Sequence, residues 1–130
     1  MSARDTVTPI THDERQKRLK ALQHSLPAFE LDAVMITPGA SMRYLFGLTW
    51  RETERLVCAV VSTKRVVFVC PKFEDTALLA ALPTPHDFAW WEEHEDPRSV
   101  VTTVLSDNNC PIVGVDPSCS YGQVFALGNL

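Results

Sequence analysis

LVCAVVSTKRVVFVC, residues 56–70, is the stretch of sequence that decides the fold. Two valine-rich runs, Leu56–Val61 and Arg65–Cys70, flank a short polar segment. Valine is enriched in strands, and polar residues between two such runs are typical of a turn. We therefore expect an antiparallel hairpin that turns at Ser62–Arg65.

The cysteines bear on both the hairpin and the redox state of the protein. In the expected register Cys58 faces Val69, and Cys70 faces Val57. Because side chains alternate between the two faces of a sheet, these sulfur atoms point to opposite faces and should not form a disulfide. The four cysteines also form no Cys-x-x-Cys pair and none of the usual zinc spacings. We expect buried, reduced thiols.

An amphipathic helix is predicted upstream of the hairpin. The run Thr11–Glu14 matches a capping box, in which the threonine caps the backbone and the glutamate returns the bond. Pro27 should end the helix near Ser25, because proline lacks a backbone donor and clashes with the preceding turn. Apolar residues recur at steps of three and four along this segment: Leu19, Leu22, Leu26 and Phe29.

A short strand and a short helix lie between that helix and the hairpin. Asp32–Thr37 is a nearly continuous apolar run, which predicts a strand covered on both faces. We expect Ser41 to cap a helix over Met42–Phe46. Gly47 is suited to close it in the left-handed conformation.

Helices and short strands also alternate downstream of the hairpin. This order favours an α/β fold, a three-layer α/β/α domain with a mixed β-sheet. We expect residues 11–130 to form this domain and residues 1–10 to form a flexible N-terminal segment. The predicted elements are a helix over Phe73–Leu82, a strand over Asp87–Trp91, a helix opened by Asp96-Pro97 and running through Ser99–Leu105, a strand over Ile112–Val115, and a helix over Cys119–Leu127.

Composition excludes several classes of function. Apolar residues make up 45% of the 130 and charged residues 22%, which are close to globular averages. The net charge is -4 and the basic residues are scattered, so we do not expect nucleic-acid binding. No run is long and apolar enough for a membrane span, and the first ten residues lack the apolar core of a secretory signal. We expect a cytoplasmic location.

Two polar clusters are candidate sites. Glu92–Asp96 could ligate a metal, but five consecutive residues cannot all converge on one ion, so we interpret it as an acidic turn leading into the helix at Pro97. The loop from Trp50 to Arg55 is either an exposed loop whose charges pair with each other or a recognition loop. Arginine suits the second role because its planar fork binds carboxylates at two points. No catalytic constellation and no metal site is expected within the chain.

The order of the local patterns resembles the creatinase/prolidase N-terminal domain, which precedes the pita-bread catalytic domain of creatinase, prolidase and aminopeptidase P. The match begins near His12. Leu31–Gly39 followed by Met42–Gly47 resembles the family's run of Leu-Asp-Ala, an apolar strand and Asn-Ile-Arg-Tyr-Leu-Thr-Gly. Further matches follow in the family order: Glu54-Arg55-Leu56, Pro71-Lys72-Phe73-Glu74, Glu95-Asp96-Pro97 and Ile112–Asp116.

This resemblance implies a function for the protein that carries the domain. Such a protein is a Xaa-Pro dipeptidase or aminopeptidase P that hydrolyses the peptide bond before proline. Its catalytic domain, absent from this sequence, holds two divalent metals, commonly manganese or cobalt. The N-terminal domain holds no cofactor itself. It caps the active site and builds part of a homodimer, so the implied partners are a second copy and a proline-containing peptide.

The resemblance also implies roles for two residues of the polar loop. The family's loop reaches toward the active site of the neighbouring subunit, and creatinase has an arginine that aligns with Arg55. Arg55 is thus the candidate anchor for a substrate carboxylate in trans, and Trp50 is a weaker candidate for lining the proline pocket. Creatinase has phenylalanine where this chain has Thr53, which argues against creatine as the substrate. Ser41 and Phe46 stand where the family favours Asn and Thr.

Other functions stay open at this point. The domain could be a stand-alone module that binds peptides or proteins without cleaving them. A small independent enzyme built on Glu92–Asp96 would need stoichiometric metal.

Overall fold

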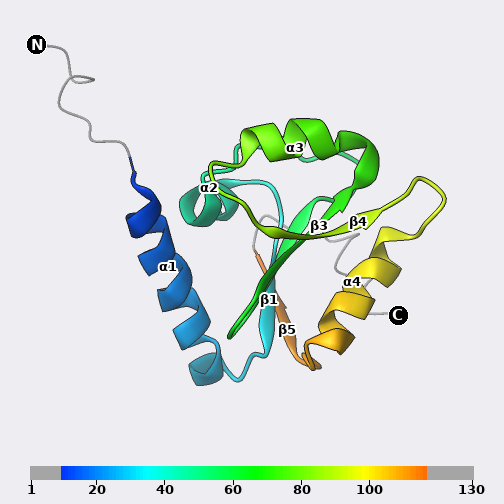
Figure 1. Cartoon of the computed structure of the whole chain (residues 1–130). Coiled ribbons are helices and arrows are strands. Elements are labelled where there is room, and N and C mark those ends of the chain that lie inside the picture. The colour runs from blue at the N-terminus through cyan, green and yellow to red at the C-terminus, as the bar shows by residue number, and fades with distance from the viewer. Residues whose placement is uncertain (1–9, 117–130) are drawn as a thin grey trace, which may run out of the picture.

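A mixed sheet of five strands forms the centre of residues 10–116, the part of the chain that the computed structural model describes (Figure 1). The strands lie in the order β4-β3-β2-β1-β5. They are β1 (Ala33–Ile36), β2 (Cys58–Ser62), β3 (Val66–Pro71), β4 (Asp87–Trp91) and β5 (Val113–Val115). The helices are α1 (His12–Ser25), α2 (Ala40–Phe46), α3 (Asp75–Ala81) and α4 (Pro97–Asp107), with short 3-10 turns η2 (Pro27–Phe29) and η3 (Lys72–Glu74).

The strand directions place one set of loops together. β5 pairs with β1 in parallel and β4 pairs with β3 in parallel, whereas β2 is antiparallel to both β1 and β3. The carboxyl ends of β1, β3, β4 and β5 therefore meet at one edge of the sheet, and β2 begins there. In sheets of this kind, ligands bind outside the carboxyl ends of parallel strands. We call this the carboxyl edge.

The expected hairpin is confirmed as β2 and β3. Cys58 pairs with Val69 in the ladder, as predicted. The turn is closed by Ser62, whose backbone N–H donates to the Arg65 carbonyl at 2.9 Å and whose hydroxyl accepts from the Arg65 N–H at 3.1 Å. Cys58 and Cys70 belong to the cores on opposite faces of the sheet, as the alternation of side chains predicted.

The sheet separates two apolar cores, which confirms the predicted three-layer α/β architecture. On one face α1, α2 and α3 bury Leu19, Phe46 and Leu78 against the sheet. On the other face α4 packs through Val101 and Val104. β1 contributes to both cores, because successive residues point to opposite faces, and this confirms a strand covered on both sides.

Several short sequence patterns form the structure that they predicted. The Thr11 hydroxyl accepts the Glu14 N–H at 3.1 Å and begins α1. The other half of the predicted capping box was wrong, because the Glu14 carboxylate pairs with Arg18 and not with the backbone at Thr11. Asp96 accepts the Arg98 N–H at 3.0 Å at the start of α4. Gly47 ends α2 with φ 68°, the left-handed conformation that glycine adopts without steric cost.

Two other local predictions were wrong. Ser41 does not cap α2, because the helix begins one residue before it, with the Gly39 carbonyl accepting the Arg43 N–H. The Ser41 hydroxyl instead donates to Asp116 at 3.3 Å, which ties α2 to the end of β5. Phe29 does not join the core and is 73% exposed, because the 3-10 turn after Pro27 breaks the helical spacing.

The other boundaries differ by a few residues. The helix predicted over Phe73–Leu82 is divided into η3 and α3, and α4 extends to Asp107. The segment predicted to be flexible and the helix expected over Cys119–Leu127 lie outside the described residues, apart from Ile10.

Candidate functional site

The polar loop between α2 and β2 lies at the carboxyl edge and is anchored at both ends. Leu48 is completely buried before it, and Leu56 is 5% exposed after it. Between them, all residues from Arg51 to Arg55 are exposed. A polar loop held by two buried leucines presents its side chains to solvent from a fixed base.

Trp50 and Arg55, the two predicted site residues, lie at opposite ends of this loop and in different environments. Trp50 is half-buried and packs against the core that faces α1, α2 and α3. The large apolar ring of Trp50 is thus partly drawn into the core, whereas Arg55 is exposed.

Arg55 is supported without an ion pair. Its guanidinium carbon lies 4.8 Å from the centroid of the Phe73 ring. Its backbone N–H donates to the Thr53 hydroxyl at 3.2 Å. Among residues 10–116, no carboxylate lies within 4.0 Å of the Arg55 side-chain nitrogens. The guanidinium donors therefore face solvent, where they can bind an incoming carboxylate at two points.

Sequence reasoning missed the aromatic support beneath Arg55. Phe73 follows β3 in turn η3, and its ring meets Trp91 at the end of β4 edge to face, with centroids 5.9 Å apart. The Trp91 indole N–H donates to the Leu56 carbonyl at 3.0 Å. In the sequence, Phe73 and Trp91 each lie at or just after the carboxyl end of a predicted strand. Their contact could have been predicted only if β3 and β4 had been known to be parallel neighbours.

The acidic cluster Glu92–Asp96 forms the turn between β4 and α4, as the structural interpretation expected. The backbone N–H of Glu92 donates to the Glu95 carboxylate at 2.9 Å, and that of Glu95 donates to the Glu92 carbonyl. Arg98 donates two side-chain hydrogen bonds to Asp96, and these bonds lower the pKa of that carboxyl. Asp96 thus caps the helix and pairs with Arg98.

Within residues 10–116, no group of three or more His, Cys, Asp or Glu side chains is arranged to hold a metal ion. In the same range, none of the helices has the length and apolar content that crossing a bilayer requires. Burial raises the pKa of the Cys70 thiol, with smaller contributions from Cys58 and Glu74. A thiol in this environment stays protonated and is a poor nucleophile.

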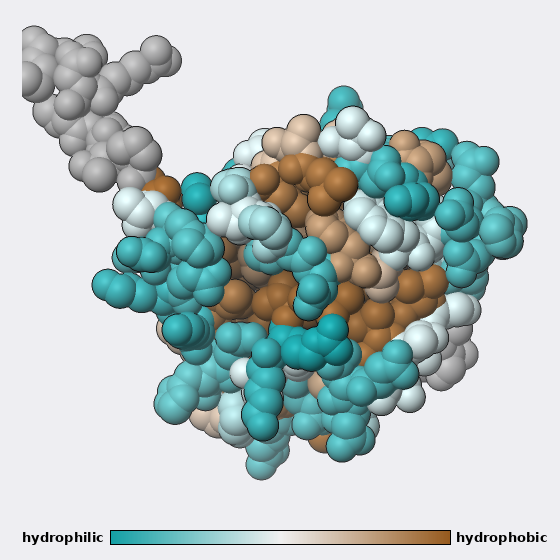
Figure 2. Space-filling model, viewed as in Figure 1, coloured by the Kyte–Doolittle hydropathy of each residue, from teal (hydrophilic) through white to brown (hydrophobic). Residues whose placement is uncertain are grey.

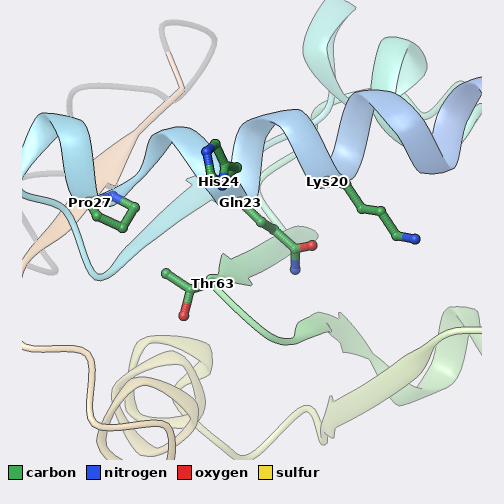
Figure 3. Close-up of a pocket in the computed structure, with 5 residues that line it drawn as sticks. All are labelled: Lys20, Gln23, His24, Pro27 and Thr63. Atoms are coloured by element: carbon green, nitrogen blue, oxygen red, sulfur yellow. The ribbon is translucent and has the colours of Figure 1, made fainter.

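Two hollows lie at the opposite edge of the sheet, next to the turn between β2 and β3. The larger, of about 580 Å³, separates the end of α1 from this turn (Figure 3). Its lining side chains do not converge: Gln23 extends from α1 on the side where the turn lies, while Lys20 and His24 point away from Thr63. The Gln23 amide donates to the Ser62 carbonyl at 3.0 Å and so serves the fold. The second hollow, of about 260 Å³, is lined by Asp32, Ser62, Thr63, Lys64, Arg65, Asn108, Asn109 and Cys110.

An apolar band crosses the surface between α1 and α4, where β3 and β4 cross the view (Figure 2). β4 is an edge strand of the sheet as described, and its Phe88 and Trp90 rings stack 4.5 Å apart with an angle of 4° between their planes. Both rings are only partly buried. Contiguous exposed apolar surface of this kind often marks an interaction site.

Solved structures share this fold. A dipeptidase from Pyrococcus horikoshii aligns with 86% of the chain at 20% identity and a TM-score of 0.73. Dipeptidase PepE from Mycobacterium ulcerans aligns with 90% of the chain at 24% identity and a TM-score of 0.77. The chain spans only 31% and 32% of these two proteins, about a third of their length.

A third structure matches nearly end to end. It is the creatinase/prolidase N-terminal domain of an X-Pro dipeptidase from Streptococcus pyogenes, with 15% identity, a TM-score of 0.73 and coverage of 87% of this chain and 86% of that one. A search of curated proteins finds no match. The family described as the creatinase/prolidase N-terminal domain matches residues 18–129, most of the sequence. The chain therefore belongs to the creatinase/prolidase N-terminal domain family.

Proposed function

We propose that this chain is the non-catalytic N-terminal domain of a Xaa-Pro peptidase of the dipeptidase or aminopeptidase P type. In this proposal the protein that carries it hydrolyses the peptide bond before proline. The domain caps the active site, contributes to a homodimer and presents Arg55 to the substrate carboxylate bound in the neighbouring subunit. Trp50 has the smaller role of lining the proline pocket from its half-buried position.

The proposal rests mainly on the exposure of Arg55 and on its lack of a carboxylate partner within residues 10–116. An exposed guanidinium with no carboxylate partner among the described residues sits at the carboxyl edge, on a loop fixed by buried leucines. Surface arginines are free to move, and binding a ligand then costs the entropy of fixing them. Arg55 is already held over Phe73, so less of this cost is left at binding. This arrangement suits recognition of a carboxylate better than stabilisation of the fold.

Two features support the remaining parts of the proposal. The apolar band on the surface (Figure 2), together with the partly buried Phe88 and Trp90 rings of edge strand β4, offers a surface for a second copy of the chain. Residues 10–116 do not fit the family's pair of divalent metals, so in this proposal manganese or cobalt is held by another part of the protein. Free thiols at Cys70 and Cys110 agree with a reducing compartment such as the cytoplasm, where we place the protein.

The first experiment reads and expresses the coding sequence beyond Leu130. We expect it to continue into a segment with two Asp, one His and two Glu as metal ligands, and the longer protein to hydrolyse Xaa-Pro dipeptides with added manganese. The 130-residue chain should show no such activity. A stop codon directly after Leu130 would contradict the proposal and would favour the stand-alone binding module instead.

The second experiment tests whether Arg55 acts in trans. An Arg55→Gln variant should be strongly impaired alone, and a variant that lacks one metal ligand should be inactive alone. If Arg55 serves the neighbouring subunit, mixed dimers regain activity, because one of the two sites then has both an intact metal centre and an intact arginine. Arg51→Gln, a change to an exposed arginine of the same loop, is the matched control and should need no complementation. Mixed dimers without activity would contradict a role in trans.

A further inference from the structure

We propose that Phe73 is a positioning residue that holds the Arg55 guanidinium in the orientation in which it receives the substrate carboxylate; this inference rests on the function proposed above. Phe73 would not touch the substrate. It would act by limiting the conformations of Arg55 before the substrate arrives.

The Arg55 guanidinium contacts the aromatic ring of Phe73. The Arg55 guanidinium carbon lies 4.8 Å from the ring centroid of Phe73, within the range of about 6 Å for a cation–π interaction. Phe73 is 44% exposed, so the pair lies at the surface. A guanidinium that lies over a ring uses its face for the contact and keeps the N–H donors at its rim available. The contact therefore orients the arginine without occupying its donors.

The Phe73 ring is itself held in place by Trp91. Phe73 packs edge to face on Trp91, with 88° between the ring planes. Trp91 is 6% exposed, and its indole N–H is bonded to the carbonyl of Leu56, the residue that follows Arg55. The chain of contacts from Arg55 through Phe73 and Trp91 thus returns to the backbone next to Arg55. Both rings are fixed by the ends of β3 and β4, so the orientation of Arg55 depends on the sheet and not on the loop alone.

In the part of the chain that the structure describes, Arg51, another arginine of the same loop, lacks the support that Arg55 has. Arg51 is exposed like Arg55 and lies four positions before it. Among the residues that the structure describes, its guanidinium has neither an aromatic ring beneath it nor a carboxylate within 4.0 Å. Of these two arginines, only Arg55 has an aromatic support, and this difference favours Arg55 as the residue that is prepared for a ligand.

The experiment uses two substitutions at one position. Phe73→Leu keeps apolar bulk but removes the ring face, whereas Phe73→Tyr keeps it. In the peptidase that carries the domain, we expect Phe73→Leu to raise KM for an Xaa-Pro dipeptide about two- to fivefold with little change in kcat. Phe73→Tyr should restore the original KM. In an Arg55→Gln background, Phe73→Leu should have no further effect on KM, because the group that it positions is gone.

A spectroscopic readout on the 130-residue chain tests the positioning without a substrate. In NMR spectra the ring current of Phe73 should shift the Arg55 side-chain protons upfield. The shift should persist in Phe73→Tyr and vanish in Phe73→Leu, while the Arg51 signals stay unchanged. Related domains of matching length form crystals as separate chains, so this chain is suitable for the measurement.

The outcomes separate the two proposals. An Arg55 shift that survives Phe73→Leu overturns this inference and leaves the proposed function intact. Loss of the shift without a change in KM also overturns it, provided that Arg55→Gln still impairs the enzyme. If Arg55→Gln has no kinetic effect, the proposed function fails and this inference fails with it. Loss of the shift together with a raised KM, rescued by Phe73→Tyr, supports both.

Discussion

Two arginines of this domain lie over aromatic rings, and the difference between them shows how one contact serves two purposes. Arg18 lies 4.1 Å from the centroid of Tyr44, donates to the Tyr44 carbonyl at 3.0 Å and pairs with Glu14 at 3.5 Å. Arg55 lies over Phe73, but the described residues give it no carboxylate within 4.0 Å. A ring orients each guanidinium group. What distinguishes them is that the Arg18 guanidinium already has polar partners, the Tyr44 carbonyl and the Glu14 carboxylate, whereas Arg55 has no such carboxylate among the described residues.

Arg18 and Tyr44, the locked pair, join two helices, whereas Arg55 and Phe73, the open pair, border solvent. Arg18 belongs to α1 and Tyr44 to α2, and the Arg18 side chain is 17% exposed. Its ring contact and its hydrogen bond to the Tyr44 carbonyl join the two helices, whereas its ion pair with Glu14 lies within α1. Arg55 makes no such connection between elements through its donors. We therefore expect substitutions at the first pair to affect folding and substitutions at the second to affect binding.

The largest effect should come from the ring beneath the open pair. Trp91→Ala removes a buried indole and leaves the Leu56 carbonyl without its donor, so we expect a loss of about 3–5 kcal/mol in the free energy of unfolding. Urea denaturation measures it. Trp90→Ala is the matched control on the other face, where the half-buried ring should cost about 1–2 kcal/mol. An equal or larger loss at Trp90 would contradict the role of Trp91 as the support.

A smaller effect is expected beside the locked pair, at the end of α2. Gly47 has a φ of 68°, and a Cβ atom there would lie 2.6 Å from the guanidinium carbon of Arg15. Gly47→Ala should lower the unfolding free energy by about 1–2 kcal/mol, since it combines backbone strain with displacement of a side chain. Gly47→Asn should cost less in the same denaturation experiment, because asparagine tolerates the left-handed conformation. A neutral Gly47→Ala variant would show that neither effect operates.

The direct comparison replaces each arginine in turn. Arg18→Ala should cost roughly 1 kcal/mol, because it removes the ring contact, a hydrogen bond and an ion pair together. Arg55→Ala should change the unfolding free energy by about 0.5 kcal/mol or less, as is usual for an exposed side chain. Thermal and urea unfolding of the two variants measure the difference. Equal losses would remove the distinction between a structural and a recognition arginine.

The smallest effect that we predict is a pH dependence which neither arginine causes. His86 packs 5.0 Å from Phe68 and 5.4 Å from Phe46, and burial lowers the pKa of its imidazole, partly opposed by Asp87. The unfolded chain then takes up a proton more readily than the folded one. Stability is full above the ordinary pKa of 6.5 and is lost as the pH falls below it. Denaturation at pH 7 and pH 5 should show this loss in both arginine variants but not in His86→Gln.

Structural features that depend on a few neighbouring residues could be predicted from the sequence. The hairpin register followed from the alternation around Cys58, and the Asp96 cap and the Gly47 terminus followed from residue types whose backbone preferences act locally. The same holds for the order of strands and helices, which predicted the mixed sheet and its two covered faces.

Structural features that depend on contacts between distant residues could not be predicted from the sequence. Ser41 was predicted to cap a helix, but its partner is Asp116, 75 residues away and directly after β5. Arg55 could be singled out from its loop, yet its contact with Phe73 depends on the topology that brings the start of β2 beside the ends of β3 and β4. Trp50 is partly buried because its ring packs against residues from distant parts of the chain that form the core on one face of the sheet.

The most direct test of a recognition role for Arg55 compares an Xaa-Pro dipeptide with its C-terminal amide. We predict that the peptidase proposed to carry this domain prefers the free carboxylate by about 10- to 150-fold in kcat/KM, the range for one charge-assisted hydrogen-bonding pair. Arg55→Gln should remove most of that preference, and Arg51→Gln should keep it. A preference that survives Arg55→Gln unchanged would contradict the claim that this side chain receives the substrate carboxylate.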